Sequence, residues 1–198
     1  NSDAQVVYPP VDTDVFDQPD WSEQETGIVC VGRISPVKRQ LDAIDVVDRL
    51  NHKGVDVHLH LVGTESNKEY AKKVRALAKN RSYVYYEGKV DNKNLISLIE
   101  RHRYGLNLMQ NEPFGMTVAE LLSGGSLPLV HNSGGQKEIV GNNDLLTFDS
   151  LEHAADQFQK LITDYETQQQ TLDELPQATS FDVQRFRAEI RNIVEQNI

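Results

Sequence analysis

Gly27-Ile28-Val29-Cys30-Val31-Gly32 is the stretch of sequence that decides the fold, and a helical pattern over 37–52 follows it. Consecutive apolar residues between two glycines predict a short strand that is buried on both faces. The segment 37–52 mixes polar and apolar residues with the spacing of a helix. A strand that runs almost directly into a helix is the first part of a βαβ unit.

The same alternation continues along the chain. Short β-branched or aromatic runs predict further strands at 55–63, 83–88, 104–109, 127–131 and 145–148. This order predicts an α/β fold, a Rossmann-like parallel sheet of about six strands with helices on both faces. Helical patterns lie near 67–80, 92–102, 115–124, 135–140 and 151–170, and a last helix near 182–197 can be capped by Ser180 or Asp182.

The chain has 198 residues, which is enough for one domain with a hydrophobic core. Residues 1–26 are rich in proline and aspartate and predict a linker or hinge segment, so the predicted domain covers 27–198. No apolar run approaches the roughly 18 residues that span a bilayer. The first residues lack the basic start and the apolar stretch of a signal peptide, so we expect a cytoplasmic protein.

The chain carries 30 acidic and 20 basic side chains, which gives a net charge of −10. This acidic balance opposes binding to nucleic-acid phosphates, so no nucleic-acid partner is expected. The single cysteine, Cys30, excludes an internal disulfide and a cysteine-based zinc site. Because it lies within the first predicted strand, we expect it to be a buried apolar residue rather than a reactive thiol.

Two cations flank the turn after the first predicted strand. Arg33 and Lys38 enclose Ser35-Pro36, where Gly32 permits a tight turn and Ser35 could cap the following helix. In an open parallel sheet, ligands bind at the carboxyl ends of the strands, where helix N-termini also favour anions. The two cations are therefore either a clamp for a diphosphate or solvated surface side chains.

The most informative stretch is Glu112-Pro113-Phe114-Gly115-Met116-Thr117-Val118-Ala119-Glu120, which follows the strand predicted at 104–109 and opens the next helix. The free N–H groups of Gly115, Met116 and Thr117 are expected to face a ligand, with a carboxylate on each side. Carboxylates accept hydrogen bonds from hydroxyl groups and amides donate to phosphate, so this arrangement suits a sugar phosphate. The alternative is that the two glutamates only complement the helix N-terminus.

Other motifs carry weaker signals. Leu61-Val62-Gly63 and Gly134-Gly135 predict tight turns at the same sheet edge. His58 and His60 alternate on one strand, as metal ligands can, but no third ligand is evident nearby. A packed or solvated strand face is therefore favoured, and no metal site is predicted. His131 follows another strand and is expected either to touch the ligand or to support residues that do.

Taken in order, these motifs resemble the donor-binding C-terminal half of retaining GT-B glycosyltransferases of the group 1 family, also called family four. The resemblance covers nearly the whole chain and rests first on Glu112 and Glu120, which have seven residues between them. It rests also on Arg33 with Lys38 and on the turns named above. The opening Tyr8-Pro9-Pro10-Val11-Asp12 resembles the hinge by which such enzymes enter their second domain.

The resemblance implies a role for each matching residue. Arg33 and Lys38 would hold the diphosphate of the donor and stabilise the leaving nucleotide. Glu112 would contact the transferred sugar and take part in catalysis, and Glu120 would hold the ribose. Further donor contacts are implied for Gly32, Lys89, Val90, Phe114, Gly115, Met116 and Thr117, with Lys89 and Val90 meeting the base.

The implied activity is transfer of a hexose from a nucleotide diphosphate sugar to an acceptor, with retention of configuration. No metal or other cofactor is expected, because Arg33 and Lys38 would neutralise the charge on the departing diphosphate. An N-terminal domain would bind the acceptor, which is a glycan, a lipid or a small molecule, so this chain is expected to be inactive alone. The full-length enzyme could associate peripherally with a membrane.

Two other functional hypotheses assign the chain to different classes of protein. One is a non-catalytic regulatory module that binds a nucleotide or a sugar phosphate. The other is a receiver-type or flavodoxin-like domain, which is disfavoured because receivers need an acidic cluster where this chain has Arg33 and Lys38. The sequence leaves the sugar, the base, the acceptor and the oligomeric state open.

Overall fold

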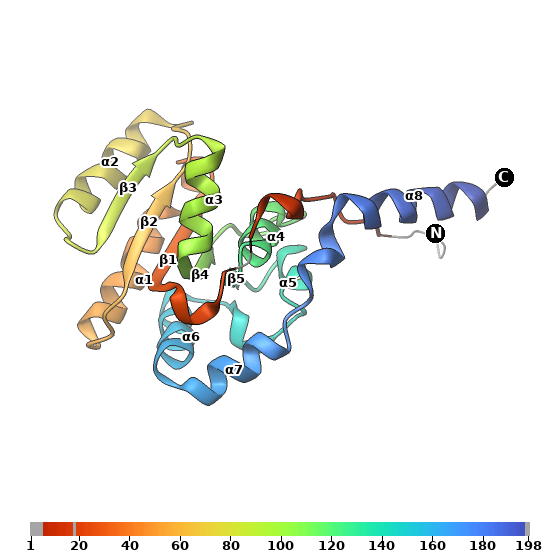
Figure 1. The fold of residues 1–198 in the computed structure, drawn as a ribbon. Coiled ribbons are helices and arrows are strands. Elements are labelled where there is room, and N and C mark those ends of the chain that lie inside the picture. The colour runs from red at the N-terminus through yellow and green to blue at the C-terminus, as the bar shows by residue number, and fades with distance from the viewer. Residues whose placement is uncertain (1–5, 18, 197–198) are drawn as a thin grey trace.

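The computed structural model describes residues 6–17 and 19–196. Its centre is a six-stranded sheet in the order β3-β2-β1-β4-β5-β6, in which every neighbouring pair is parallel (Figure 1). The predicted α/β class and strand number are confirmed. The strands are β1 (Glu25–Val31), β2 (His58–Val62), β3 (Val84–Gly88), β4 (His102–Asn107), β5 (Leu127–His131) and β6 (Thr147–Phe148).

Helices follow the strands as the alternation predicts. They are α1 (Gln40–His52), α2 (Lys68–Lys79), α3 (Asn92–Arg101), α4 (Met116–Ser123), α5 (Gln136–Ile139), α6 (Leu151–Thr163), α7 (Tyr165–Asp173) and α8 (Val183–Gln196). Short 3-10 turns lie at η1 (Thr13–Val15), η2 (Trp21–Glu23), η3 (Pro36–Lys38), η4 (Asp144–Leu146) and η5 (Ala178–Phe181).

Two predicted helices are interrupted. The helix expected over 37–52 is divided into η3 and α1, because Arg39 adopts a left-handed conformation with φ 58°. The helix expected over 151–170 is divided into α6 and α7 at Asp164, whose extended backbone lets its side chain accept a hydrogen bond from the Thr167 amide. At the last helix, Asp182 accepts a hydrogen bond from the Arg185 amide, so it is the cap that the helix uses.

The sheet is covered on both faces. Ile28, Leu59 and their neighbours in one set of alternating strand residues belong to the main core, with residues of α1, α2 and α6. Val29 and Val62 point to the opposite face and pack against residues of α3 and α4. Cys30 is buried in the main core, as expected, and burial raises the pKa of its thiol to about 12.

The segment 1–26, predicted as a linker or hinge, lies against the domain in its described part, and its last two residues, Glu25 and Thr26, already belong to β1. Val11 is buried, and its amide donates a hydrogen bond to the Phe181 carbonyl at 2.8 Å. Trp21 donates from Nε1 to Gln168 and packs edge-to-face on Tyr104. These contacts make the segment part of the folded unit that α7 and η5 also complete.

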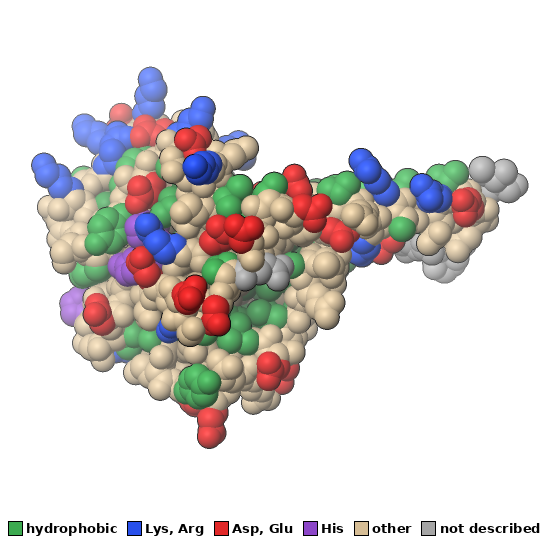
Figure 2. All heavy atoms as spheres, in the orientation of Figure 1, with side chains coloured by type: hydrophobic (Ala, Val, Ile, Leu, Met, Phe, Trp, Pro, Cys, Tyr) green, Lys and Arg blue, Asp and Glu red, His purple; other side chains and the backbone are tan. Residues whose placement is uncertain are grey.

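The helix α8 extends away from the body of the protein (Figure 1) and has no buried residue. The apolar side chains Ile190 and Val194 are exposed on it. On the face drawn in Figure 2, Lys and Arg side chains gather over the end of the protein that carries α2, some also lie along α8, and acidic side chains are scattered over the rest. Within the described ranges, no helix combines the length and the apolar character that crossing a membrane requires.

Candidate functional site

The candidate site lies where the order of the strands reverses. The chain begins the sheet at β1, adds β2 and β3 on one side, and then returns to place β4 on the other side of β1. The loops after β1 and β4 therefore leave the sheet in opposite directions and open a crevice between them. The predicted cations follow β1 and the predicted glutamate Glu112 follows β4, so this topology brings them together.

The loop after β1 is held by a buried glutamine. Gln40 is fully buried, its Nε2 donates to the Arg33 carbonyl at 2.9 Å, and its Oε1 accepts from the Ser35 amide at 3.2 Å. The predicted capping role of Ser35 is wrong, because its side chain makes no cap hydrogen bond and points to the Arg33 carbonyl instead. The loop is thus fixed from inside the domain, and the Arg33 side chain stays exposed.

The tight turn that the Leu61-Val62-Gly63 motif predicts follows β2, and in the structure it closes against the turn after β1. Gly63 has φ +151°, and a Cβ there would lie 1.9 Å from the Gly32 carbonyl oxygen. Its amide donates to the Gly88 carbonyl at 2.8 Å, so β1, β2 and β3 end at one common edge. Only a glycine permits this approach of the two backbones.

Lys38 and Glu112 form an ion pair across the crevice. Lys38 Nζ lies 2.6 Å from Glu112 Oε2, and the two side chains are only 17% and 14% exposed. The aliphatic part of Lys38 passes over Gly32, 3.4 Å from where a Cβ would be. The loops after β1 and β4 thus bring a cation and a carboxylate side by side.

Arg33 differs from Lys38 in having no internal partner. Within the described part of the chain its guanidinium makes no ion pair or hydrogen bond, and the residue is exposed. A free guanidinium next to a paired lysine leaves one cation available to an incoming anion without the rupture of an existing contact.

The Gly-Gly turn after β5 supports the Glu112 loop through its backbone. Gly134 pairs with Glu112 in a short parallel bridge, and the Gly135 amide donates to the Glu112 carbonyl at 2.8 Å. A Cβ at Gly134, which has φ +72°, would lie 2.3 Å from that carbonyl oxygen. Both glycines are therefore required for the position of Glu112.

The start of α4 forms the expected amide cradle. Gly115 has φ +81° and caps the helix without a side chain. The amides of Gly115, Met116 and Thr117 donate to none of the residues that the structure describes, so they are available to phosphate or sugar oxygens. Phe114 and Met116 are 55% and 48% exposed, which leaves two apolar side chains beside the cradle.

Glu120 lies one turn further along α4 and lines a separate cavity of about 280 Å³. Asp12 and Asn92 add polar groups to that cavity, while Phe16 and Leu95 are among its apolar walls. Burial raises the pKa of the Glu120 carboxyl above its ordinary value. A half-buried carboxylate in a small, mostly apolar cavity is suited to accept hydrogen bonds from the hydroxyl groups of a ribose.

Glu120→Gln is expected to stabilise the ligand-free protein and to weaken nucleotide binding. The pKa of Glu120 is higher in the folded than in the unfolded chain, so its contribution to stability is full at low pH and is lost as pH rises through the folded pKa. At pH 7 the variant should therefore melt at a higher temperature than the wild type, and at pH 4 the difference should shrink. Its affinity for a nucleoside diphosphate should fall about 10-fold through loss of a charged acceptor.

Thermal melts at the two pH values and calorimetric titration with GDP test this expectation. Glu195→Gln on α8 is the control, because it removes the same charge from an exposed position. Equal melting changes in both variants would show that net charge, and not burial of Glu120, is responsible.

Lys89 and Val90 follow β3 at the same edge of the sheet. Val90 packs on the smaller hydrophobic cluster and Lys89 is exposed. Within the described residues, neither side chain makes a hydrogen bond or ion pair with the other predicted site residues. Their predicted contact with a base remains a prediction.

The sequence-based prediction does not include Gln136, which is important for the shape of the site. Gln136, at the first position of α5, is fully buried, and its Nε2 donates to the carbonyl groups of Met109, His131 and Ser133. It therefore ties the loops after β4 and β5 together. A glutamine placed directly after a Gly-Gly turn is the only signal in the sequence for this role, and Gln40 is its counterpart after β1.

His131 belongs to the same loop support. Its Nδ1 lies 2.9 Å from Ser133 Oγ, and that oxygen accepts from the Asn111 amide next to Glu112. Burial lowers the pKa of His131 below its ordinary value. Of its two predicted roles, these contacts favour support of the Glu112 loop.

Comparison with known proteins agrees with the resemblance. The family model described as "Glycosyl transferases group 1" matches residues 11–174. A GDP-Man:Man(3)GlcNAc(2)-PP-Dol alpha-1,2-mannosyltransferase of Mus musculus is 33% identical over 147 residues, which is 67% of this chain and 30% of that protein. The enzyme of the same description from Homo sapiens is 31% identical over the same shares. The chain thus spans about a third of the length of these relatives.

Solved structures share the fold at lower identity. Anabaena Alr3699/HepE in complex with UDP-glucose has a TM-score of 0.79 and 19% identity, over 97% of this chain and 57% of that one. AviGT4, a glycosyltransferase involved in Avilamycin A biosynthesis, has a TM-score of 0.70 and 20% identity, over 98% of this chain and 60% of that one. With the strand order and the crevice already established, the family match over residues 11–174 means that the chain belongs to the glycosyl transferases group 1 family.

Proposed function

We propose that this chain binds the nucleotide diphosphate sugar in a retaining glycosyltransferase and transfers its hexose together with the acceptor-binding part of a longer protein. The observation that carries the proposal is the Lys38–Glu112 pair at the reversal of the strand order, beside the open amides of α4. A cation, a carboxylate and free N–H groups in one crevice match the three parts of such a donor: its phosphates, its sugar hydroxyls and its bridging oxygens.

In this proposal the phosphates bind first to Arg33, whose guanidinium is free, and then draw Lys38 away from Glu112. Glu112 would thereby be released to accept a hydrogen bond from a hydroxyl of the hexose. The amides at the start of α4 would donate to phosphate and sugar oxygens, with Gly32 giving the phosphates access to the backbone. The apolar side chains Phe114 and Met116 would cover the sugar, and Lys89 with Val90 would meet the base.

The transfer itself breaks the bond between the anomeric carbon and the phosphate oxygen, and the electron pair leaves with the nucleoside diphosphate. Arg33 and Lys38 would stabilise the negative charge that develops there, which is an electrostatic contribution of several kcal/mol. The acceptor oxygen forms the new bond on the same face of the sugar, and its proton passes to the departing phosphate. Glu112 would hold the sugar during this step, and none of it requires a metal ion.

GDP-mannose is the donor we propose to test first. The curated relatives named above carry GDP-Man in their descriptions and are 31–33% identical. A UDP-hexose is the second candidate, because HepE binds UDP-glucose and has the same fold at 19% identity. The acceptor, retention of configuration and any peripheral membrane association belong to the longer protein and are likewise proposals.

A thermal titration with GDP-mannose, UDP-glucose and an ADP sugar tests the proposal. At a ligand concentration 100 times Kd, binding should stabilise the protein by about 2.7 kcal/mol. We expect GDP-mannose to give the largest shift in Tm, and no sugar to be transferred by this chain alone. A Tm that no nucleotide sugar changes would contradict the proposed donor site. Binding without transfer in the full-length protein would favour the regulatory module instead.

A further inference from the structure

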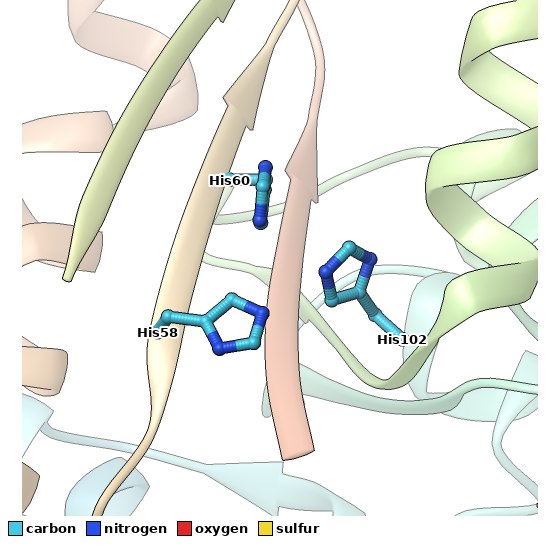
Figure 3. A group of neighbouring side chains, drawn as sticks. All are labelled: His58, His60 and His102. Atoms are coloured by element: carbon cyan, nitrogen blue, oxygen red, sulfur yellow. The ribbon is translucent and has the colours of Figure 1, made fainter. Parts of the chain in front are cut away.

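Three histidines converge near the amino ends of the strands, whereas the donor crevice lies at the carboxyl ends. His58 and His60 extend from β2 and His102 from the start of β4, and their rings meet over β1, which lies between these two strands (Figure 3). One ring nitrogen from each histidine can be chosen so that the three atoms all lie within 4.8 Å of one another. His58 and His102 stand at the amino ends of their strands, so the cluster is independent of the residues that follow the carboxyl ends.

A glycine makes this convergence possible. Gly27 of β1 pairs with His58 and separates the two histidine-bearing strands. A Cβ at Gly27 would lie 2.2 Å from His58 Nε2 and 2.5 Å from His102 Cδ2, so any other residue would force the rings apart. The three atoms nearest to that position all belong to imidazole rings.

In two of the rings, the Nδ1 atom has a hydrogen-bond partner outside the cluster. His60 Nδ1 lies 2.8 Å from a carboxylate oxygen of Glu87, and His102 Nδ1 lies 2.6 Å from the Leu98 carbonyl. Both partners accept hydrogen bonds, so each Nδ1 carries the proton and each Nε2 keeps its lone pair. Metal-binding histidines are oriented by this same type of contact to a carboxylate or a backbone carbonyl.

The inner nitrogens lack hydrogen-bond partners. His58 Nε2 and His102 Nε2 are buried, and neither has a hydrogen-bond partner among the described residues. His60 and His102 are 7% and 0% exposed at their side chains. Burial lowers the pKa of all three rings, that of His102 to about 3.

A carboxylate stands beside the three rings. Glu25 Oε2 lies 3.5 Å from His58 Nε2 and 3.8 Å from His102 Nε2. Its other oxygen, Oε1, lies 3.4 Å from Arg101 Nε, so the arginine holds the carboxylate while leaving one oxygen toward the rings. Three imidazoles and one carboxylate are a ligand set that suits Zn²⁺.

We propose that His58, His60 and His102, with Glu25 as the fourth ligand, bind a Zn²⁺ ion that ties β1, β2 and β4 together. Four ligands from the protein make the site structural rather than catalytic. A tetrahedral ion with bonds of about 2.1 Å places ligand nitrogens about 3.4 Å apart, so the rings need to close by at most about 1.4 Å. The sequence-based interpretation favoured a packed or solvated strand face because the third ligand, His102, begins a different strand far along the chain.

Calorimetric titration of the chelator-treated protein with Zn²⁺ tests the site. The wild type should bind one ion, and Co²⁺ in its place should give the visible absorption of a four-coordinate cobalt site. His58→Ala, at the more exposed rim of the cluster, should lose the binding and the cobalt band. His52→Ala is the matched control, because it removes an exposed histidine near the end of α1. Equal binding by the wild type and His58→Ala would overturn the proposal, as would an equal loss in His52→Ala.

A second variant tests the site independently, in case His58→Ala does not fold. Glu87→Gln keeps the size of the side chain but weakens the contact that orients His60, so Zn²⁺ affinity should fall about 10- to 100-fold. Circular dichroism of the metal-free variants verifies that they are folded. GDP titration of His58→Ala should match the wild type, because the donor crevice lies at the other edge. Unchanged Zn²⁺ affinity in a folded Glu87→Gln variant would also contradict the proposed ligand geometry.

Discussion

Replacing both Arg33 and Lys38 with alanine is expected to lower the affinity for GDP at least about 100-fold. Each cation contributes a charge-assisted hydrogen bond to phosphate, worth about 1.5–3 kcal/mol. Loss of Lys38 has a second effect in the same direction, because Glu112 is then left without its partner 2.6 Å away and repels an incoming anion. Calorimetric titration with GDP and with UDP measures the change.

The matched control is Lys72→Ala with Lys73→Ala, which removes two positive charges from an exposed face of α2. This variant should bind GDP like the wild type, apart from a small, salt-dependent change. If the two double variants bound GDP equally well, the loop after β1 would not be the phosphate site. The single variants should show that Arg33→Ala weakens binding without changing stability, since Arg33 is exposed and free of described partners.

Gly134→Ala is expected to destabilise the protein by about 2–5 kcal/mol and to remove donor binding. The positive φ of +72° is unfavourable for alanine, and the added Cβ would lie 2.3 Å from the Glu112 carbonyl oxygen and 2.7 Å from the Glu112 amide. These atoms are backbone and cannot rotate away, so the Glu112 loop must move. The free energy of unfolding in urea and the affinity for GDP-mannose measure the two effects.

Gly54→Ala provides the control for the backbone conformation alone. Gly54 has φ +80° but nothing within 4 Å of the position of a Cβ, so its replacement should cost only the strain of about 1–2 kcal/mol. The difference between the two variants isolates the steric contact with Glu112. Equal costs, together with normal donor binding by Gly134→Ala, would mean that the Gly-Gly turn does not position Glu112.

Much of the fold follows from local patterns. The apolar run from Ile28 to Val31 and its equivalents predict the strands, because buried parallel strands have no polar face. The boundaries that differ are decided by single side chains or dihedrals that periodicity does not report. Asp164 ends α6 by capping α7, and Arg39 separates η3 from α1 by adopting a left-handed conformation.

The sequence predicts which residues belong to the candidate site, but it does not predict which of them contact each other. Arg33, Lys38, Glu112 and Glu120 stand out because charged residues follow apolar strands at the edge where ligands bind. That Lys38 neutralises Glu112, while Arg33 remains free, depends on the side chains of two loops 74 residues apart in sequence. The roles of Gln40 and Gln136 are not predicted, because the sequence does not distinguish a buried, hydrogen-bonded glutamine from one on the surface.

The sequence by itself determined the α/β class, the edge of the sheet that carries the charged motifs and the residues that belong to them, since strand periodicity and glycine turns are local properties. Tertiary structure alone decided which of these residues touch. It joined Lys38 to Glu112, placed Glu120 in a cavity of its own, and brought His102 to His58 and His60 over Gly27. The physical reason is that neighbouring strands of a parallel sheet can be far apart in the sequence. Contacts between their side chains therefore produce no periodic pattern from which they could be predicted.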